Sequence, residues 1–439
     1  MTYEVFAIIQ LLVLIFILAR FLKKQGIVIL VDQVKIMFLL WIITLILYDF
    51  KLSTLYSPTI QINIISIVIW GSFLILSKFT FLKTRDINTL CQELKEKKNF
   101  NIYFHISNLI FIVAVIVFIY NVNKYGLKIL EENKIDKQQI DHYATYIVHM
   151  LVLCAEIKYI LFRNNKRIVD IIVFIGSLVV LALTLNRGPI AFLFITIGIY
   201  EVFRFIDIKD SLSKGKKWII YGGFTGVILL FIWFFGYIGN MRMEYVLENI
   251  YDRTLWEHYG VSPLIPSGFL WLYIYLTSPL QNAAFAISNE VINGYGFFGN
   301  LFYPFVKFGA NIIGKGEEFK LWLINQGNYT PHLQEEVGLN AMTFIPEAFQ
   351  DAGLIGLVSY LSIYILLGYI SIRIIKSKKM SAAGKILIYT NITSIILWSI
   401  FVNSFKIPIL ILNILLIFAI EYLLIKKESW VKPWMKRYI

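Results

Sequence analysis

The sequence predicts an all-α integral membrane protein with about eleven transmembrane helices, in a range of 10 to 12, and one large folded loop outside the cytoplasm. Hydrophobic residues make up 58% of the 439 positions and charged residues only 16%, whereas soluble domains carry about 25% charged residues. Apolar stretches recur along the chain at lengths near the roughly 20 residues that a spanning helix needs. Their regular succession is interrupted once, by a long segment at 240–351.

Each expected span is an apolar stretch whose backbone groups must be satisfied within the helix itself, because lipid supplies no hydrogen-bond partners. The first stretch lacks a basic leader and a small-residue cleavage pattern, so we expect it to be retained as a span. In chain order, the expected spans are 5–21, 29–48, 60–76, 102–120, 143–161, 168–185, 190–205, 218–236, 354–374, 386–401 and 409–424.

The connections between spans predict the orientation, because cytoplasmic loops retain Lys and Arg. The loops that connect successive spans fall into two alternating sets, one on each side of the membrane. One set contains 27 Lys and Arg residues and the other contains 12, and two more lie inside spans. This places the N-terminus outside the cell, the C-terminus in the cytoplasm and the long segment outside. The net charge of +13 is spread over six loops, which argues against nucleic-acid binding.

The segment 240–351 is the predicted location of function. It is 112 residues long and contains 21 aromatic residues, so its composition is that of a folded loop. The apolar stretches 268–287 and 297–313 predict helices that lie against or dip into the outer leaflet. The expected organisation is an N-terminal transmembrane bundle at 1–239, the loop at 240–352, and a C-terminal segment at 353–439 with a basic tail.

Three arginines are candidates for binding an anionic group at the outer surface. Arg187 lies between two spans, where Asn186 or Arg187 caps a helix that has Pro189 in its first turn. A helix N-terminus beside a guanidinium favours phosphate oxygens. Arg242 and Arg253 follow the eighth span. Snorkelling of Arg187 and ion pairs of the other two with nearby carboxylates are the simpler alternatives.

A second candidate group lies at the far end of the loop, directly before a span. His332, Glu347 and Asp351 are the candidate catalytic residues there, because a carboxylate or His can deprotonate a hydroxyl group. Glu347 and Asp351 are four residues apart and share a helix face. Solvated charges at a helix start are the alternative. Neither a metal-ligand spacing nor a P-loop is present, so no metal or cofactor is expected.

Ionisable residues also occur in the fifth span. His149 and Glu156 are seven residues apart and would share a helix face, either for function or for a hydrogen bond between helices. Lys158 lies toward the cytoplasmic end, where we expect it to snorkel. Cys91 and Cys154 are far apart, and we expect both to be inert.

The chain resembles the Wzy-type oligosaccharide repeat-unit polymerases of O-antigen, capsule and exopolysaccharide assembly. The resemblance rests on the span pattern and on four short segments. These segments are LNRGP at 185–189, GNMR at 239–242, YLTSP at 275–279 and PEAFQDAGLIG at 346–356. It implies a GT-C-like membrane glycosyltransferase in the bacterial plasma membrane, with its active site facing outward.

The resemblance also implies the reaction and its partners. A growing glycan would pass from undecaprenyl pyrophosphate to the non-reducing end of a new lipid-linked repeat unit. Arg187, Arg242 and Arg253 would stabilise the departing pyrophosphate, and Glu347, His332 or Asp351 would deprotonate the acceptor. Membrane lipid, a chain-length regulator and a flippase are the expected partners. A lipid-linked oligosaccharide flippase and an O-antigen ligase are the alternatives.

Overall fold

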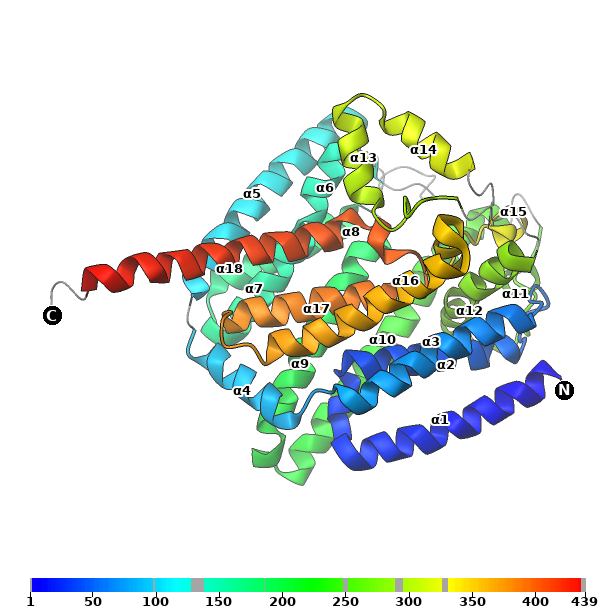
Figure 1. The fold of residues 1–439 in the computed structure, drawn as a ribbon, viewed down its shortest axis with the longest axis horizontal. Helices are drawn as coiled ribbons and strands as arrows, with labels where there is room; N and C mark the ends of the chain where they lie inside the picture. Colours follow the sequence, from blue (N-terminus) through cyan, green and yellow to red (C-terminus); the bar gives the residue numbers. More distant parts are fainter. Residues whose placement is uncertain are drawn as a thin grey trace. The chain divides into compact units, whose positions relative to one another are not determined.

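The described part of the chain is helical. The computed structural model describes residues 2–97, 99–127, 138–184, 186–247, 252–288, 295–325 and 331–435. No β-strand occurs among these residues, and a single isolated bridge pairs Ser53 with Val261. The predicted all-α class is therefore confirmed for this part of the chain (Figure 1).

Six of the described helices are long and apolar enough to cross a membrane by length and composition. They cover Tyr3–Leu30, Ile60–Phe79, Phe100–Tyr125, Tyr143–Asn165, Gly188–Ser211 and Phe344–Ile375. Shorter apolar helices lie at Ile168–Leu183, Ala382–Trp398 and Pro408–Leu424. These helices identify the chain as an all-α membrane protein, while the count of eleven spans stays a prediction.

The chain forms two compact units that alternate along the sequence. Unit 1 comprises Met1–Phe81, Lys209–Leu367 and Ile395–Ile407, and unit 2 comprises Leu82–Ile208, Gly368–Ser394 and Pro408–Ile439. This division differs from the three consecutive segments expected above. Segments distant in sequence pack together, so the chain passes from one unit to the other several times.

Unit 1 is built around α2 and α12. The helix α2 packs between α1 and α3, and α12 packs against α2, α3, α10 and α15 (Figure 1). The helices of this unit are α1 (Tyr3–Gln25), α2 (Gln33–Asp49), α3 (Ile60–Phe79), α10 (Lys214–Val246), α11 (Leu255–His258), α12 (Ser267–Ser288), α13 (Tyr303–Ile312), α14 (Gly316–Asn325), α15 (His332–Val337) and most of α16 (Phe344–Ile375).

The first apolar stretch of the loop, which is expected to lie against or dip into the outer leaflet, forms α12 and packs against other helices of unit 1. Most side chains of α12 are buried, among them Trp271 and Gln281, because α10 and α12 approach each other closely. A Cβ atom on Gly236 of α10 would lie 2.6 Å from the Cα atom of Gly268. By contrast, no residue of α13 is buried, and Phe308 and Ile312 are exposed.

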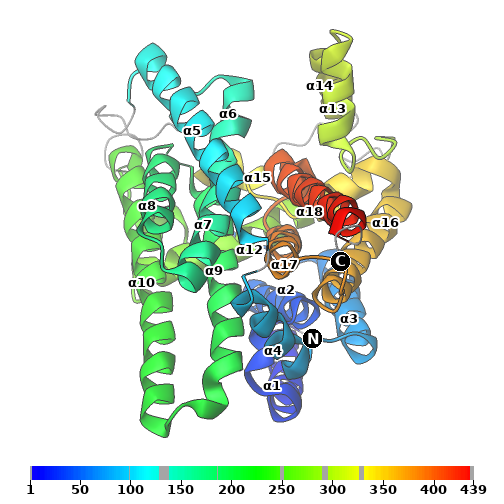
Figure 2. The ribbon, with the colours of Figure 1, turned by 90° about the vertical axis from the view of Figure 1, so that its left-hand side faces the viewer.

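Unit 2 is built around α7. The helix α7 packs against α5, α8 and α9, and α4 packs against α9 (Figure 2). Its helices are α4 (Thr84–Lys95), α5 (Phe100–Tyr125), α6 (His142–His149), α7 (Leu151–Asn165), α8 (Ile168–Leu183), α9 (Arg187–Ile208) and most of α17 (Ala382–Trp398) and α18 (Pro408–Met435). The expected span 143–161 comprises α6 and α7, which meet at Met150 with hydrogen bonds continuing through it, so that Tyr143–Asn165 is one candidate span.

Candidate functional site

The candidate site in unit 1 is organised by a break in α16. Residues Ala352 (φ −163°, ψ 34°) and Gly353 (φ 58°, ψ −137°) are not helical, although helix continues on both sides. Glycine tolerates the positive φ that Gly353 adopts, and this explains why the helix can bend there. The short N-terminal part of α16 carries Glu347 and Asp351, so the two carboxylates lie before the bend.

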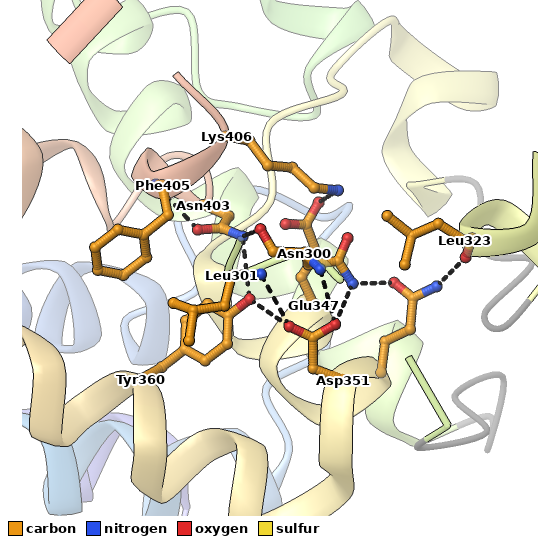
Figure 3. Close-up of polar contacts among 10 residues, drawn as sticks. Asn300, Leu301, Leu323, Glu347, Asp351, Tyr360, Asn403, Phe405 and Lys406 are labelled. Atoms are coloured by element: carbon orange, nitrogen blue, oxygen red, sulfur yellow. Dashed lines mark hydrogen bonds and ion pairs between the residues drawn. The ribbon is translucent and has the colours of Figure 1, made fainter. Parts of the chain in front are cut away.

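The carboxylate of Asp351 is buried and fully engaged. Its Oδ1 atom accepts hydrogen bonds from the backbone N–H of Asn300 at 3.0 Å and from the Asn300 Nδ2 atom at 2.9 Å. Its Oδ2 atom accepts from the Leu301 N–H at 3.0 Å and from the Tyr360 hydroxyl at 2.8 Å. Figure 3 shows the carboxylate among these donors. Such an arrangement anchors the 295–301 segment to α16.

The same network reaches two further segments. The Asn300 side chain donates to Gln350 Oε1 at 2.9 Å, and Gln350 donates to the Leu323 carbonyl at 2.6 Å. Asn403 donates to the Asn300 carbonyl and to the Tyr360 hydroxyl, each at 3.3 Å (Figure 3). The site is therefore assembled from the 295–325 region, from α16 and from the 399–407 segment.

A glycine makes this assembly sterically feasible. The N–H of Gly296 donates to the Gln350 carbonyl at 2.8 Å. A Cβ atom at position 296 would lie 2.8 Å from Asp351 Oδ1 and 2.9 Å from the Gln350 carbonyl oxygen. Gly296 therefore supports a close backbone approach within unit 1.

Glu347 lies one turn before Asp351 and has a different environment. Its Oε1 atom is 2.8 Å from the Nζ atom of Lys406, which also lies over the Tyr303 ring at 5.3 Å. The Glu347 side chain is 18% exposed, and its Oε2 atom accepts no hydrogen bond from the described residues. One oxygen of this carboxylate is thus held, while the other has no partner in the described site (Figure 3).

His332 and Arg253 are held in other parts of unit 1. The His332 ring stacks on Phe285 at 4.1 Å between centroids, and its Nε2 atom is 3.3 Å from Glu336. Arg253 is exposed just before α11. Burial lowers the pKa of His258, and hydrogen bonds from Thr254 lower the pKa of Glu257; the charge of Arg253 contributes to both shifts.

The side chains of Arg187 and Arg242 lie outside the described residues. Their backbones place them in α9 of unit 2 and in the last turns of α10 in unit 1. The Asn186 Oδ1 atom accepts from the Gly188 N–H at 3.3 Å, so Asn186 caps the start of α9. Convergence of the three arginines stays a prediction.

The expectation for Lys158 is wrong. Its side chain is completely buried in unit 2, and its Nζ atom is 2.9 Å from Asp170 of α8. Snorkelling was the simpler expectation for a lysine near a helix end, but a carboxylate on the neighbouring helix provides a partner inside the unit. His149 and Glu156 lie in separate helices, and His149 faces the Asn186 amide at 3.5 Å.

The residues that complete the candidate site carry little sequence signal. Asn300, Asn403 and Lys406 lie 43–59 positions from their partners in α16. Each of these residues stands among apolar residues such as Phe298, Leu301 and Phe405, and nothing local indicates a partner. Only the fold brings these side chains together with Glu347 and Asp351.

No protein-family model, curated protein or solved structure matches this chain.

Proposed function

We propose that the chain polymerises lipid-linked oligosaccharide repeat units at the outer face of a bacterial plasma membrane. The growing glycan is transferred from a polyprenyl pyrophosphate to the non-reducing end of a new lipid-linked unit. Four short segments that resemble repeat-unit polymerases support the proposal, and one of them contains Glu347 and Asp351. Eleven spans, with the N-terminus outside and the C-terminus in the cytoplasm, belong to the same proposal.

The observation that carries the proposal is the difference in partners between the two carboxylate oxygens of Glu347. A general base needs an oxygen that can accept a proton from the acceptor, and the Oε2 atom of Glu347 is buried without a hydrogen-bond partner among the described residues. In the proposed reaction the side chains that cover this atom move aside when the acceptor binds. Lys406 orients the carboxylate through its other oxygen. Asp351 is poorly suited to this role, because four hydrogen bonds occupy its oxygens.

In the proposed step, the acceptor hydroxyl oxygen forms a bond to the anomeric carbon of the donor glycan. The bond from that carbon to the pyrophosphate oxygen breaks, and the pyrophosphate leaves with the bonding electron pair. Glu347 takes the hydroxyl proton. Arg187, Arg242 and Arg253 are the candidates to stabilise the departing charge, because cationic groups placed near a developing anion lower the barrier.

The test is chain growth by the purified protein on lipid-linked repeat units. We expect Glu347→Gln to lower the rate by a factor of about 10²–10⁴, the usual loss when a general base is removed. Asp351→Asn is the matched control, because it changes the neighbouring carboxylate that anchors the 295–301 segment and is not the proposed base. Unchanged chain growth in Glu347→Gln, with the wild-type level of protein in the membrane, would exclude Glu347 as the base.

A lipid-linked oligosaccharide transporter is the second candidate, and one observation favours it. The helices of unit 2 enclose the buried carboxylates Glu156 and Asp170, and polar groups inside membrane helices often mark transport pathways. The two functions differ in outcome. Loss of a polymerase leaves single repeat units on the outer leaflet, whereas loss of a transporter leaves them on the cytoplasmic leaflet.

A further inference from the structure

Unit 2 contains a buried carboxylate whose partners are all neutral. Glu156 lies on α7, and its side chain is 1% exposed. Its Oε1 atom accepts from the Thr196 hydroxyl of α9 at 2.7 Å, and its Oε2 atom accepts from the Asn391 Nδ2 atom of α17 at 2.9 Å. No Lys, Arg or His among the described residues forms an ion pair with Glu156.

Many charged and titratable groups on the surrounding helices interact with partners other than Glu156. These partnerships are Lys158 with Asp170, Arg163 and Tyr159 with Glu201, Lys385 with Glu93, Lys95 with Asp207, Tyr103 with Glu421, His149 beside Asn186, and Cys154 with Ser107 and Ser177. Among the residues that the structure describes, the hydrogen bonds to Glu156 come from two neutral donors, Thr196 and Asn391.

Two neutral donors are a weak counterbalance for a buried charge. A buried ion without an opposite charge carries a large desolvation cost, and hydrogen bonds from two neutral groups recover only part of it. A proton on the carboxyl group removes the charge entirely. The energetic balance therefore favours a neutral Glu156.

The hydrogen bonds around Glu156 accommodate that proton. The Asn391 Nδ2 atom also donates to the Leu387 carbonyl at 2.9 Å, so the amide presents N–H, and not oxygen, to the carboxyl group. A metal cation bound to Glu156 would need an oxygen ligand from Asn391 and not an N–H group. The Thr196 hydroxyl can instead reverse its role and accept the carboxyl proton, while its own hydrogen turns to the carbonyl four residues back.

An orphaned acceptor in the same cluster gives an independent indication. Asn413 of α18 is 1% exposed and donates to Asn391 Oδ1 at 3.3 Å. Its own Oδ1 atom is buried and receives no hydrogen bond from the described residues. Buried acceptors of this kind are usually satisfied by a water molecule, which can also deliver a proton.

We propose that Glu156 is a proton-binding site inside unit 2. The neutral carboxyl group donates to Thr196 and accepts from Asn391, and a water molecule bound at Asn413 exchanges the proton. The proposal is independent of glycan polymerisation, because Glu156 belongs to neither group of candidate site residues.

Infrared difference spectroscopy of the purified, lipid-reconstituted full chain tests the proposal. We expect the wild type at pH 7 to show the C=O stretching band of a protonated carboxyl group that is missing from Glu156→Gln and moves to lower frequency in ²H₂O. Glu201→Gln is the matched control, because it removes a carboxylate that is paired with Arg163. That variant is expected to retain the band.

Variants at Thr196 test the hydrogen bond separately. Thr196→Val removes the acceptor, so we expect the band to shift to higher frequency, and Thr196→Ser should restore its position. The band positions in the Thr196 variants also test the proposal if Glu156→Gln does not fold. An unchanged spectrum in both Glu156→Gln and Thr196→Val overturns the proposal. So does a sodium-dependent gain in wild-type stability that Glu156→Gln abolishes, since it would identify a cation site.

Discussion

Buried polar side chains connect the helices of each unit, and the cost of removing one depends on what its partners lose. Asp351 accepts hydrogen bonds from Asn300, Leu301 and Tyr360, all of which are buried or nearly so. Glu347, only one turn away, has one ionic partner and is partly exposed. Replacement of Asp351 and replacement of Glu347 should therefore change the stability by different amounts, although the two carboxylates lie one helix turn apart.

The first residue-scale prediction concerns Asp351. We expect Asp351→Ala to lower the free energy of unfolding by about 3–5 kcal/mol, because several buried donors lose their acceptor at once. Thermal unfolding of the detergent-solubilised protein measures this loss. Glu347→Ala is the control, with an expected loss of no more than about 1 kcal/mol. Equal losses in the two variants would contradict the anchoring role of Asp351.

The second residue-scale prediction concerns the buried pair of Lys158 and Asp170. Lys158→Met should destabilise the protein by about 3–5 kcal/mol, because Asp170 is left as an unpaired buried charge. The double variant Lys158→Met with Asp170→Leu should recover most of that loss. A double-mutant cycle of unfolding midpoints measures the coupling. Additive losses would show that the two charges do not depend on each other.

At the scale of elements, the bend in α16 separates a polar segment from an apolar one. Glu347 and Asp351 precede the bend at Ala352 and Gly353, and the residues after it include the exposed apolar Leu354 and Ile355. An unbroken helix would not keep both the anchoring contacts of Asp351 and the direction of the apolar segment. The bend is thus part of the candidate site.

The element-scale prediction concerns the glycine at the bend. Gly353 adopts a φ of 58°, and a Cβ atom there would meet no heavy atom within 4 Å. We therefore expect Gly353→Ala to cost about 1–3 kcal/mol through backbone strain alone. Gly198→Ala in α9 is the control: it also meets no atom, has no positive φ, and should be neutral or stabilising by up to about 1 kcal/mol. Comparison of unfolding midpoints distinguishes the two.

At the scale of the whole molecule, orientation in the membrane determines where the candidate site works. The site in unit 1 lies in the long loop and at its return into α16, and the cation distribution predicts that this region faces outward. Both native cysteines are buried, and burial raises the pKa of Cys91 to about 12. The wild-type chain should therefore react little with thiol reagents.

That low background gives a direct test of orientation by single introduced cysteines. Lys315 lies between α13 and α14, and Lys378 follows α16; both are exposed. We expect Lys315→Cys to react with a membrane-impermeant maleimide in intact cells, and Lys378→Cys to react only after permeabilisation. The reverse pattern would place the candidate site in the cytoplasm and exclude the proposed polymerase.

Sequence patterns alone were sufficient for features that depend on local composition. The helical class, the apolar stretches and the Asn186 cap of α9 follow from side chains that lie next to one another in the chain.

Only the tertiary structure determined which polar residues work together. Lys406 beside Glu347, Asn300 beside Asp351 and Asp170 beside Lys158 join residues 12–59 positions apart. The burial of α12 likewise depends on its packing against α2 and α10. Hydropathy reports how apolar a segment is, but lipid and protein interior are equally apolar. The polar residues that form the site are therefore brought together only when the helices pack.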